Sequence, residues 1–332
     1  MRKRPIILVC AALAGGAGCG DYLPEGPLAE HSQAIKDGDP ATAAGAFGAV
    51  AILDNDGVQY CSGVLVSATC VVTAAHCVVL QDDATGEVIA ELGPANMRVV
   101  AGALDATDVP VEQTYRIRKV VRHEGFPVPG TIGSVTLSRA EDIALLMLDT
   151  PVQTMSPVLR VSPDELDVLL HEGTPVVIAG YGARDENGQL SGSLYFGETP
   201  FQQRNETEFS AGAPGSPDGC AGDSGGPASI LQGGEPHLLG ISVRAIRSPG
   251  GPDCGEGGIY TLVPAYRSWL EENADGELPI TGDEARGGCS VSGLRRASGG
   301  PRMGLLGALM VIAFRIIRRR IRRPRRRAGA LG

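Results

Sequence analysis

The 332-residue chain is poor in the side chains that usually carry proton transfer or large aromatic contacts. Aromatic residues make up 4% of it, and its one tryptophan is Trp269. Its five histidines are His31, His76, His123, His171 and His237. Because histidine is the side chain whose ordinary pKa lies near neutral pH, a proton-transferring histidine has few candidates. Only His76 lies in an informative pattern, and we expect the other four to be surface or structural residues.

Basic residues are scarce in the body of the chain. Of 29 lysines and arginines, 3 lie in residues 1–34 and 12 in residues 289–332, a segment without any acidic residue. Residues 35–288 therefore hold 14 basic residues against 35 acidic ones. Such an acidic body is consistent with a soluble extracellular enzyme that attracts basic substrates, and it argues against nucleic acid as a partner.

The apolar segment close to the C-terminus is short for a bilayer span. Residues 303–314 are apolar over about 12 positions, whereas a transmembrane helix needs roughly 20. At the other end, residues 1–19 combine a basic start with an apolar stretch, which is typical of a secretory signal. Their last residues, Gly-Ala-Gly-Cys, leave two alternatives open: a lipoprotein signal with a lipidated Cys19, or simple cleavage and release.

Between these ends the chain shows the pattern of an all-β protein. Short β-branched runs are separated by glycine, proline and aspartate, without repeats and with little helical pattern before residues 263–273. A hydrophobic content of 43% is enough to bury a substantial core. Prolines interrupt the strands within residues 149–163, so we expect a break between two parts of the fold there.

Residues 222–227, Gly-Asp-Ser-Gly-Gly-Pro, are the most informative segment of the chain. A serine between glycines lies on tight backbone, which leaves its hydroxyl and the nearby amides open to an incoming carbonyl. Alone, the segment could also be a glycine-rich turn between strands. A serine hydroxyl is a weak nucleophile at neutral pH, so a catalytic role requires a base and a group that orients the base.

Two further segments supply candidates for these partners. His76 lies in Thr-Ala-Ala-His-Cys, residues 73–77, after a strand-like apolar run. Asp142 opens the apolar stretch 142–148 and should be half-buried. A buried acid costs free energy unless it is hydrogen-bonded, and an imidazole N–H is a suitable donor.

The three segments, in the order His, Asp, Ser, resemble the trypsin/chymotrypsin-like serine proteases over about residues 35–273. The resemblance implies that Ser224 attacks the scissile carbonyl, His76 transfers the proton, and Asp142 orients the imidazole. It also implies an oxyanion hole formed by the N–H groups of Gly222 and Ser224. The implied fold is two packed antiparallel six-stranded β-barrels with a short C-terminal helix and the active site between the barrels. No cofactor or metal is implied, and we expect a monomer.

The resemblance extends to the cysteines and to activation. It pairs Cys61 with Cys77 and Cys220 with Cys254, which implies an oxidising compartment. Cys70 has no evident partner and is expected to be a buried free thiol. Residues 35–38, Ile-Lys-Asp-Gly, resemble the start of a mature protease. Residues 20–34 would then be a propeptide, removed by another protease so that the new Ile35 ammonium pairs with Asp223.

The pocket that selects the substrate side chain is partly standard and partly altered. Asp218, six residues before Ser224, takes the position that selects Arg or Lys in trypsin-like enzymes, although residues 216–219 also fit an ordinary β-turn. Gly258 matches a glycine that keeps such a pocket open. Where the family has Ser-Trp-Gly on the facing wall, this chain has Val243-Arg244-Ala245, or a register that begins at Ser242. The tryptophan is missing in both, Ala245 could narrow the pocket mouth, and Arg244 could favour acidic residues upstream of the cleavage point.

The C-terminal tail carries a second resemblance. Gly-Gly-Cys-Ser at 287–290, the apolar segment and the arginines of 315–327 resemble the sorting tails of myxobacterial surface proteins. This implies that sorting machinery modifies or processes the chain at Cys289, while a plain membrane anchor with a cytoplasmic basic end is the alternative. Residues 274–302 would form the linker and sorting motif, and residues 303–332 the hydrophobic segment and arginine-rich tail.

Three functions remain open on the sequence alone. The first is a serine endopeptidase that cleaves proteins or peptides after Arg or Lys, secreted or attached to the outside of a bacterial envelope. The second is the same fold cleaving after small or apolar residues. The third is a catalytically silent surface module that only binds. The intact set of His76, Asp142, Ser224 and Gly222 favours an enzyme over the silent module.

Overall fold

The computed structural model describes residues 35–43, 46–82, 85, 87–128, 135–183, 191–249 and 251–278. All of them belong to the first of two compact units, Met1–Gly287 and Gly288–Gly332. The predicted signal segment 1–19, the predicted propeptide 20–34, Cys289 and the tail 303–332 lie outside the described residues. Within the described ranges, no helix is both long enough and apolar enough to cross a membrane.

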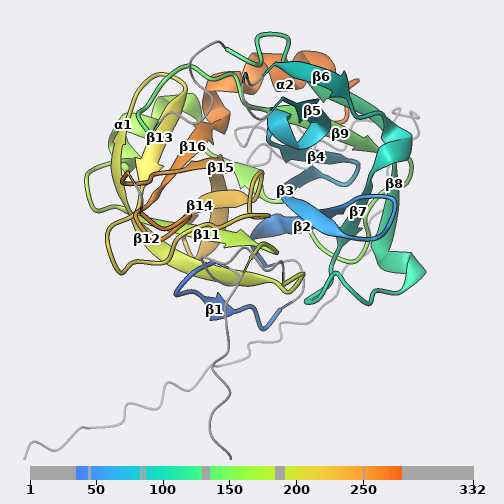
Figure 1. The fold of residues 1–332 in the computed structure, drawn as a ribbon, viewed down its shortest axis with the longest axis horizontal. Helices are drawn as coiled ribbons and strands as arrows, with labels where there is room; N and C mark the ends of the chain where they lie inside the picture. Colours follow the sequence, from blue (N-terminus) through green and yellow to red (C-terminus); the bar gives the residue numbers. More distant parts are fainter. Residues whose placement is uncertain are drawn as a thin grey trace, which may run out of the picture. The chain divides into compact units, whose positions relative to one another are not determined.

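The first half of the chain forms a closed six-stranded antiparallel barrel (Figure 1). In barrel order its strands are β2 (Ala49–Leu53), β3 (Gln59–Ser67), β4 (Cys70–Thr73), β9 (Ala144–Leu148), β8 (Thr114–Arg122) and β7 (Arg98–Ala101). Every residue of β2, β4 and β9 is buried, which explains why these strands are continuous apolar runs instead of alternating ones.

The second half forms another antiparallel ring of six strands, closed by the pairing of β12 with β13. In ring order the strands are β12 (Tyr195–Arg204), β11 (Pro175–Gly180), β14 (Pro227–Gln232), β15 (Glu235–Ala245), β16 (Gly258–Leu262) and β13 (Glu208–Ala211). Two short strands lie outside the ring: β1 (Asp39–Pro40) pairs with β12, and β10 (Leu159–Arg160) pairs in parallel with β15. The predicted pair of six-stranded barrels is confirmed.

The remaining elements are short. A hairpin joins β5 (Val79–Gln81) to β6 (Val88–Glu91), and α1 (Leu166–Leu169) is a single turn. The predicted C-terminal helix is α2 (Arg267–Asn273), and Trp269 within it donates from Nε1 to Glu124 at 3.0 Å. Single 3₁₀ turns lie at Ala46–Gly48, Ala75–Val78, Pro94–Asn96, Val111–Gln113, Pro163–Glu165 and Val263–Tyr266.

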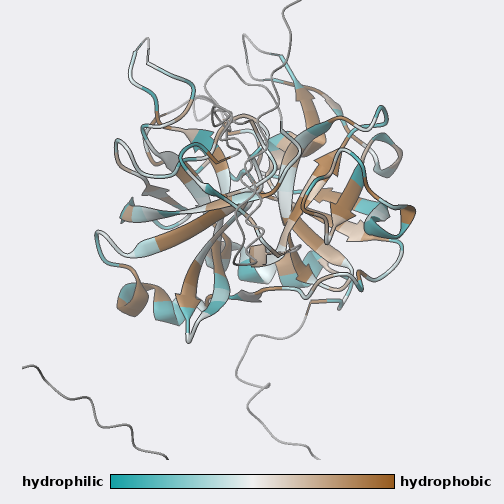
Figure 2. Cartoon of the chain, turned by 90° about the horizontal axis from the view of Figure 1, so that it is seen from below, coloured by the Kyte–Doolittle hydropathy of each residue, from teal (hydrophilic) through white to brown (hydrophobic). Residues whose placement is uncertain are grey.

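The hydrophobic residues are concentrated on the strands of the two barrels, whereas the loops between strands are largely hydrophilic (Figure 2). β9 ends the first barrel at Leu148, and the first strand of the second ring, β11, begins at Pro175. The connection between the barrels therefore includes residues 149–163, where the prolines predicted a break. This two-barrel arrangement brings chemistry-bearing residues from distant parts of the chain together.

Candidate active site

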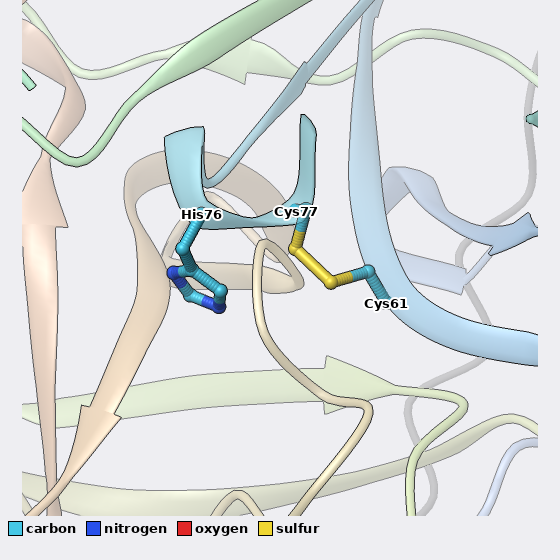
Figure 3. A group of neighbouring side chains, drawn as sticks. All are labelled: Cys61, His76 and Cys77. Atoms are coloured by element: carbon cyan, nitrogen blue, oxygen red, sulfur yellow. A yellow bond between two sulfur atoms is a disulfide. The ribbon is translucent and has the colours of Figure 1, made fainter. Parts of the chain in front are cut away.

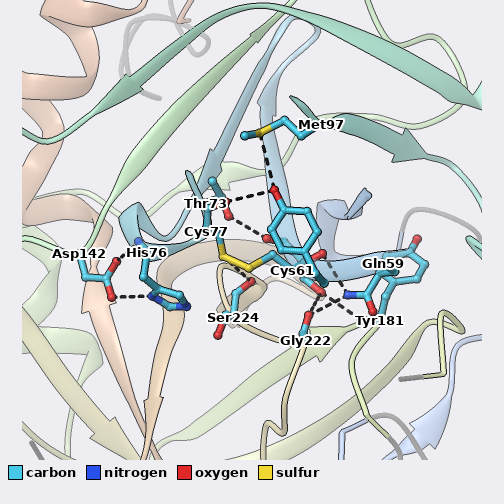
Figure 4. Close-up of a disulfide and its surroundings, with 12 residues drawn as sticks. Gln59, Cys61, Thr73, His76, Cys77, Met97, Asp142, Tyr181, Gly222 and Ser224 are labelled. Carbon is cyan, nitrogen blue, oxygen red and sulfur yellow. Dashed lines mark hydrogen bonds and ion pairs between the residues drawn. A yellow bond between two sulfur atoms is a disulfide. The ribbon is translucent and has the colours of Figure 1, made fainter. Parts of the chain in front are cut away.

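His76 and Asp142 are brought together by the pairing of β4 with β9. His76 lies in the 3₁₀ turn directly after β4, and Asp142 lies just before β9, where Thr73 pairs with Ala144. The Asp142 carboxylate accepts a hydrogen bond from His76 Nδ1 at 2.8 Å and another from the His76 backbone N–H at 3.0 Å (Figure 4). The Asp142 carbonyl also accepts from Thr261 Oγ1 at 2.9 Å. The acid is thus held by both its side chain and its backbone.

The environment of His76 suits the imidazole to accept a proton. Burial of the imidazole is the largest influence and lowers its pKa, but the negative charge of Asp142 and the hydrogen bond to it raise the pKa, so that the pKa of His76 is raised overall. The positive charge of Arg244 lowers it. Because Nδ1–H donates to Asp142, the tautomer is fixed and the Nε2 lone pair is left to accept a proton.

Ser224 lies on a sharp turn that packs directly against the first barrel. Its carbonyl oxygen accepts from the Ser62 N–H of β3 at 2.8 Å. Gly222 and Gly225 have φ angles of 87° and 81°, in the region that favours glycine. A Cβ on Gly225 would collide with Thr73 Oγ1 and with the Ser62 carbonyl oxygen. The glycines of the 222–227 segment therefore allow the serine turn to approach the His76 side of the site.

Two contacts of the Cys77 sulfur connect Ser224 with His76. Cys77 Sγ lies 3.7 Å from the Ser224 carbonyl oxygen. The same sulfur lies within 4.8 Å of a nitrogen of the His76 ring. In the view of Figure 4, Asp142, His76 and Ser224 follow one another in that order, with Ser224 on the side of the imidazole away from Asp142.

The backbone at Gly222 is held by two side chains that the sequence did not point to. The Gly222 carbonyl oxygen accepts from Gln59 Nε2 at 2.9 Å and from Ser62 Oγ at 3.0 Å. Among the residues that the structure describes, the N–H groups of Gly222 and Ser224 donate to no other protein group. Both donors are thus available to an oxygen of a bound substrate.

The cysteines form the two disulfides that the resemblance implies, Cys61–Cys77 and Cys220–Cys254. Cys61, Cys77 and His76 lie together and would offer sulfur and nitrogen ligands to a metal (Figure 3). The two sulfurs are bonded to each other, however, so neither is a thiolate and the cluster is not a metal site. Cys70, at the start of β4, is a buried free cysteine, and burial raises the pKa of its thiol.

Asp223 is enclosed by backbone donors. Its carboxylate accepts from the N–H groups of Cys220 at 2.9 Å and Gly182 at 2.8 Å. The backbone of Ile35, a residue that is 1% exposed, also hydrogen-bonds to it. Burial raises the pKa of Asp223 to about 7, because these hydrogen bonds only partly offset the cost of removing the charge from water. The structure thus brings Ile35 and Asp223 together.

The Asp218 carboxylate is also hydrogen-bonded by backbone N–H groups of the protein. One carboxylate oxygen accepts from Gly255 N at 2.6 Å and from Gly257 N at 3.1 Å, and the other accepts from Gly219 N at 2.9 Å. Its side chain is 1% exposed, and burial raises its pKa, whereas these bonds and the charge of Lys36 lower it. The Lys36 side chain lies over Gly255, whose N–H donates to Asp218.

The wall that faces the serine turn is formed by the end of β15. The Ser242 carbonyl accepts from Gly225 N at 2.7 Å, and Ser242 N donates to the Gly226 carbonyl at 2.9 Å, so Ser242 pairs with the turn that carries Ser224. Ala245 pairs with Gly258 across β15 and β16. Arg244 forms two 2.9 Å hydrogen bonds to Glu208, with side chains that are 9% and 1% exposed. Its charge is already compensated, which weakens the prediction that it selects acidic substrate residues.

The model of the family described as Trypsin matches residues 35–270. This chain belongs to the trypsin family. It is 31% identical over 229 residues to human chymotrypsin-like elastase family member 1, covering 63% of this chain and 79% of that protein. It is 28% identical to mouse serine protease 56 (71% of this chain, 38% of the relative) and 28% identical to mouse transmembrane protease serine 11E (66% and 49%). The trypsin-like chain is a serine endopeptidase, and its substrates are proteins or peptides.

Several residues that shape the site of this trypsin-like protease were not singled out from the sequence. Gln59 and Ser62 hold the Gly222 backbone, Glu208 pairs with Arg244, and Lys36 acts on the pKa of Asp218. The burial of Glu208 could not be predicted from the sequence, because a strand of four residues is too short to show which side of it is buried. Lys36 lies in residues 35–38, which the sequence indicated only as the start of the mature protease, and nothing in that pattern connected it with Asp218.

Proposed function

We propose that the chain is a secreted serine endopeptidase that hydrolyses peptide bonds through an acyl-enzyme, with His76, Asp142 and Ser224 as its catalytic residues. The observation that carries the proposal is the 2.8 Å hydrogen bond from His76 Nδ1 to Asp142, which leaves Nε2 available on the side of Ser224. A silent binding module would not need this geometry.

The reaction follows from these positions. Ser224 Oγ attacks the scissile carbonyl while His76 Nε2 takes its proton, and Asp142 stabilises the resulting imidazolium. The oxyanion accepts hydrogen bonds from the Gly222 and Ser224 N–H groups, where the loss of one donor costs about 3 kcal/mol of transition-state stabilisation. His76 then protonates the leaving amine. Water repeats the sequence on the acyl-enzyme and releases the second product.

Activation is proposed to begin with cleavage between Ala34 and Ile35 by another protease. The buried position of Ile35 and the hydrogen bond from its backbone to Asp223 support this order of events. Cleavage would convert an amide N–H into an ammonium beside the carboxylate. An opposite charge at that distance favours the ionised form of Asp223, which backbone donors alone leave with a raised pKa.

Two specificities are proposed for testing. Cleavage after Arg or Lys rests on Asp218, which lies six residues before Ser224 and would pair with a cationic substrate side chain. Cleavage after small or apolar residues is favoured by a different observation: three backbone donors and the charge of Lys36 already act on Asp218, and Ala245 lies opposite Gly258. The human relative's name, an elastase, points in the same direction.

Location, processing and assembly complete the proposal. We propose a monomeric protease on the outside of a bacterial envelope, released or attached through the C-terminal tail at Cys289. A lipid on Cys19 would hold the uncut chain, because the cut before Ile35 separates Cys19 from the catalytic domain. Sorting machinery or the membrane would be the partner of that tail. The acidic body between residues 35 and 288 supports a soluble enzyme that does not bind nucleic acid.

The test of the proposal uses chain processed at Ile35, with Ser224→Ala as the matched control. Peptide substrates identical except for a terminal Arg, Lys, Ala or Phe are offered to both proteins, and an organophosphate probe is used to label the serine. We expect hydrolysis and labelling of the parent and neither in Ser224→Ala. Absence of both in the parent would favour the binding module, while the preferred substrate decides between the two specificities.

A further inference from the structure

Three segments from different parts of the chain meet at a buried ion pair beside the proposed catalytic residues. Glu208 begins β13, Arg244 lies near the end of β15, and Ser138 lies in the segment that leads to Asp142. Arg244 Nη1 and Nη2 each donate to a different Glu208 carboxylate oxygen at 2.9 Å. Such a two-pronged guanidinium–carboxylate pair is among the strongest and most directional polar contacts in proteins.

The pair also binds the segment before Asp142. Glu208 accepts from the Ser138 N–H at 2.6 Å and from Ser138 Oγ at 3.3 Å, and Arg244 donates to Ser138 Oγ at 3.3 Å. The Ser138 carbonyl accepts from Asn205 Nδ2 at 2.7 Å and from Thr207 Oγ1 at 3.3 Å. Ser138 belongs to the connection between the strands of the first barrel, and all its partners here belong to the second half of the chain.

We propose that Glu208 and Arg244 are positioning residues of this protease: together they hold the segment from Ser138 to Asp142 against the second barrel, and so fix the carboxylate that orients His76. The inference rests on the proposed function of His76 and Asp142. Its physical basis is that a buried pair with several hydrogen bonds has a single low-energy arrangement, because any displacement leaves a buried charge without its partner.

The Glu208–Arg244 pair also acts electrostatically on the pKa of His76. Two charges act on His76: Asp142, from the segment before β9, raises its pKa, and Arg244, from β15, lowers it. The neighbouring acid Glu141 is paired with Arg139 and His123 and is not among the charges that shift the pKa of His76. Glu208 compensates the charge of Arg244, so the two members of the pair must influence the imidazole in opposite directions.

Two substitutions test the inference through the acidic limb of the pH profile of kcat/KM, which reports the free-enzyme pKa of the catalytic base. Glu208→Gln keeps the shape but removes the negative charge that pairs with Arg244, so the limb should move to lower pH by about half a unit. Arg244→Gln removes the positive charge and exposes His76 to Glu208, so the limb should move to higher pH by a similar amount. Each should also lower kcat about tenfold, because Asp142 loses its fixed position.

Three controls separate position from charge and from misfolding. Asp167→Asn breaks the exposed Asp167–Arg204 pair of the same half of the chain and should leave the profile unchanged. The double variant Glu208→Gln with Arg244→Gln should return the limb toward that of the parent while kcat stays low. Arg244→Lys keeps the charge without the two-pronged geometry, so it should lower kcat and leave the limb in place. Titration of the reactive serine with an organophosphate counts the folded, active molecules, so that every kcat is expressed per active molecule.

The outcomes distinguish this inference from the function on which it rests. A parent protein that neither hydrolyses peptides nor reacts with the organophosphate overturns the proposed function itself. An active parent whose Glu208→Gln and Arg244→Gln variants keep the parent kcat, or move the acidic limb in the same direction, overturns only the positioning role. Opposite movements of the limb together with reduced kcat support it.

Discussion

The two sides of the proposed active site treat buried charge differently. On the first-barrel side, Asp142 and His76 form one hydrogen-bonded pair, and the His76 side chain stays 25% exposed with Nε2 available. On the other side, Asp218, Asp223 and Glu208 are each 1% exposed, and each is enclosed by several donors of the protein itself. The first arrangement leaves Nε2 of His76 available for proton transfer. In the second, the buried carboxylates hold the surrounding backbone and side chains in place.

This difference predicts different consequences of substitution. Removing a charge on the first-barrel side should change the rate of reaction with little effect on the fold. Removing a charge on the second-barrel side should change stability, pH response or selectivity and lower kcat about tenfold at most, because its partners would be left buried and unpaired. Three experiments test this contrast.

The largest effect is expected for Asp142→Asn, which should lower kcat on the order of 10⁴-fold. Asparagine has nearly the same shape, but its amide cannot stabilise the imidazolium or hold the Nδ1–H tautomer. The melting temperature should change little. Asp149→Asn, an exposed acid a few residues further along the chain, is the matched control and should keep the parent rate. A decrease of kcat by less than tenfold in Asp142→Asn would contradict the prediction that charge on the first-barrel side controls the rate of reaction.

An intermediate effect is expected for the pH dependence of stability before and after cleavage at Ile35. Folding raises the pKa of Asp223 from 3.8 to about 7, so the uncut folded chain holds this proton more tightly than the unfolded chain. Stability should therefore be lost as pH rises from about 4 to about 7, by up to roughly 4 kcal/mol. In the cut chain the Ile35 ammonium favours the charged carboxylate, and most of this loss should disappear.

Urea unfolding of Ser224→Ala protein, uncut and cut, at pH values from 4 to 8 measures this difference. In Asp223→Asn both forms should lack this component of the pH dependence, because the substituted side chain does not titrate. Identical pH dependence of the cut and uncut chains would show that the new N-terminus does not reach Asp223.

The smallest effect is expected for Lys36→Met, which removes the positive charge that acts on Asp218. A less compensated carboxylate should attract a cationic substrate side chain more strongly. We expect kcat/KM for Arg substrates relative to Ala substrates to rise about tenfold, which corresponds to about 1.4 kcal/mol. Lys119→Met, at an exposed lysine of β8, is the control. An unchanged or lower ratio would mean that Lys36 does not limit access of cations to Asp218.

The sequence predicted the parts of the molecule that are marked by runs of apolar residues or by motifs of closely spaced residues. Runs of apolar residues predicted strands, and the order of the three motifs implied the two barrels. The two-residue strands β1 and β10 could not be predicted, because two residues form no periodic pattern.

In the candidate site, the same limit applies to contacts between distant residues. Gln59 lies 163 positions from Gly222, and Glu208 lies 36 positions from Arg244. Neither pairing follows from spacing, since each depends on how strands of a closed barrel bring side chains together. The departure at Val243-Arg244-Ala245 was visible in the sequence, but the partner that neutralises Arg244 was not.

The short strand β1 has a consequence for how copies of this protein meet. One edge of β12 is paired with β11 along its first half, and on the other edge β13 covers only Phe201 to Arg204. β1 covers Tyr195 and Phe196 on that edge with Pro40 and Asp39. A bare strand edge invites a strand from another chain, but a cover that ends in a proline without an N–H and a charged residue does not. Two residues thus close the start of that β12 edge to a strand from another copy of the protein.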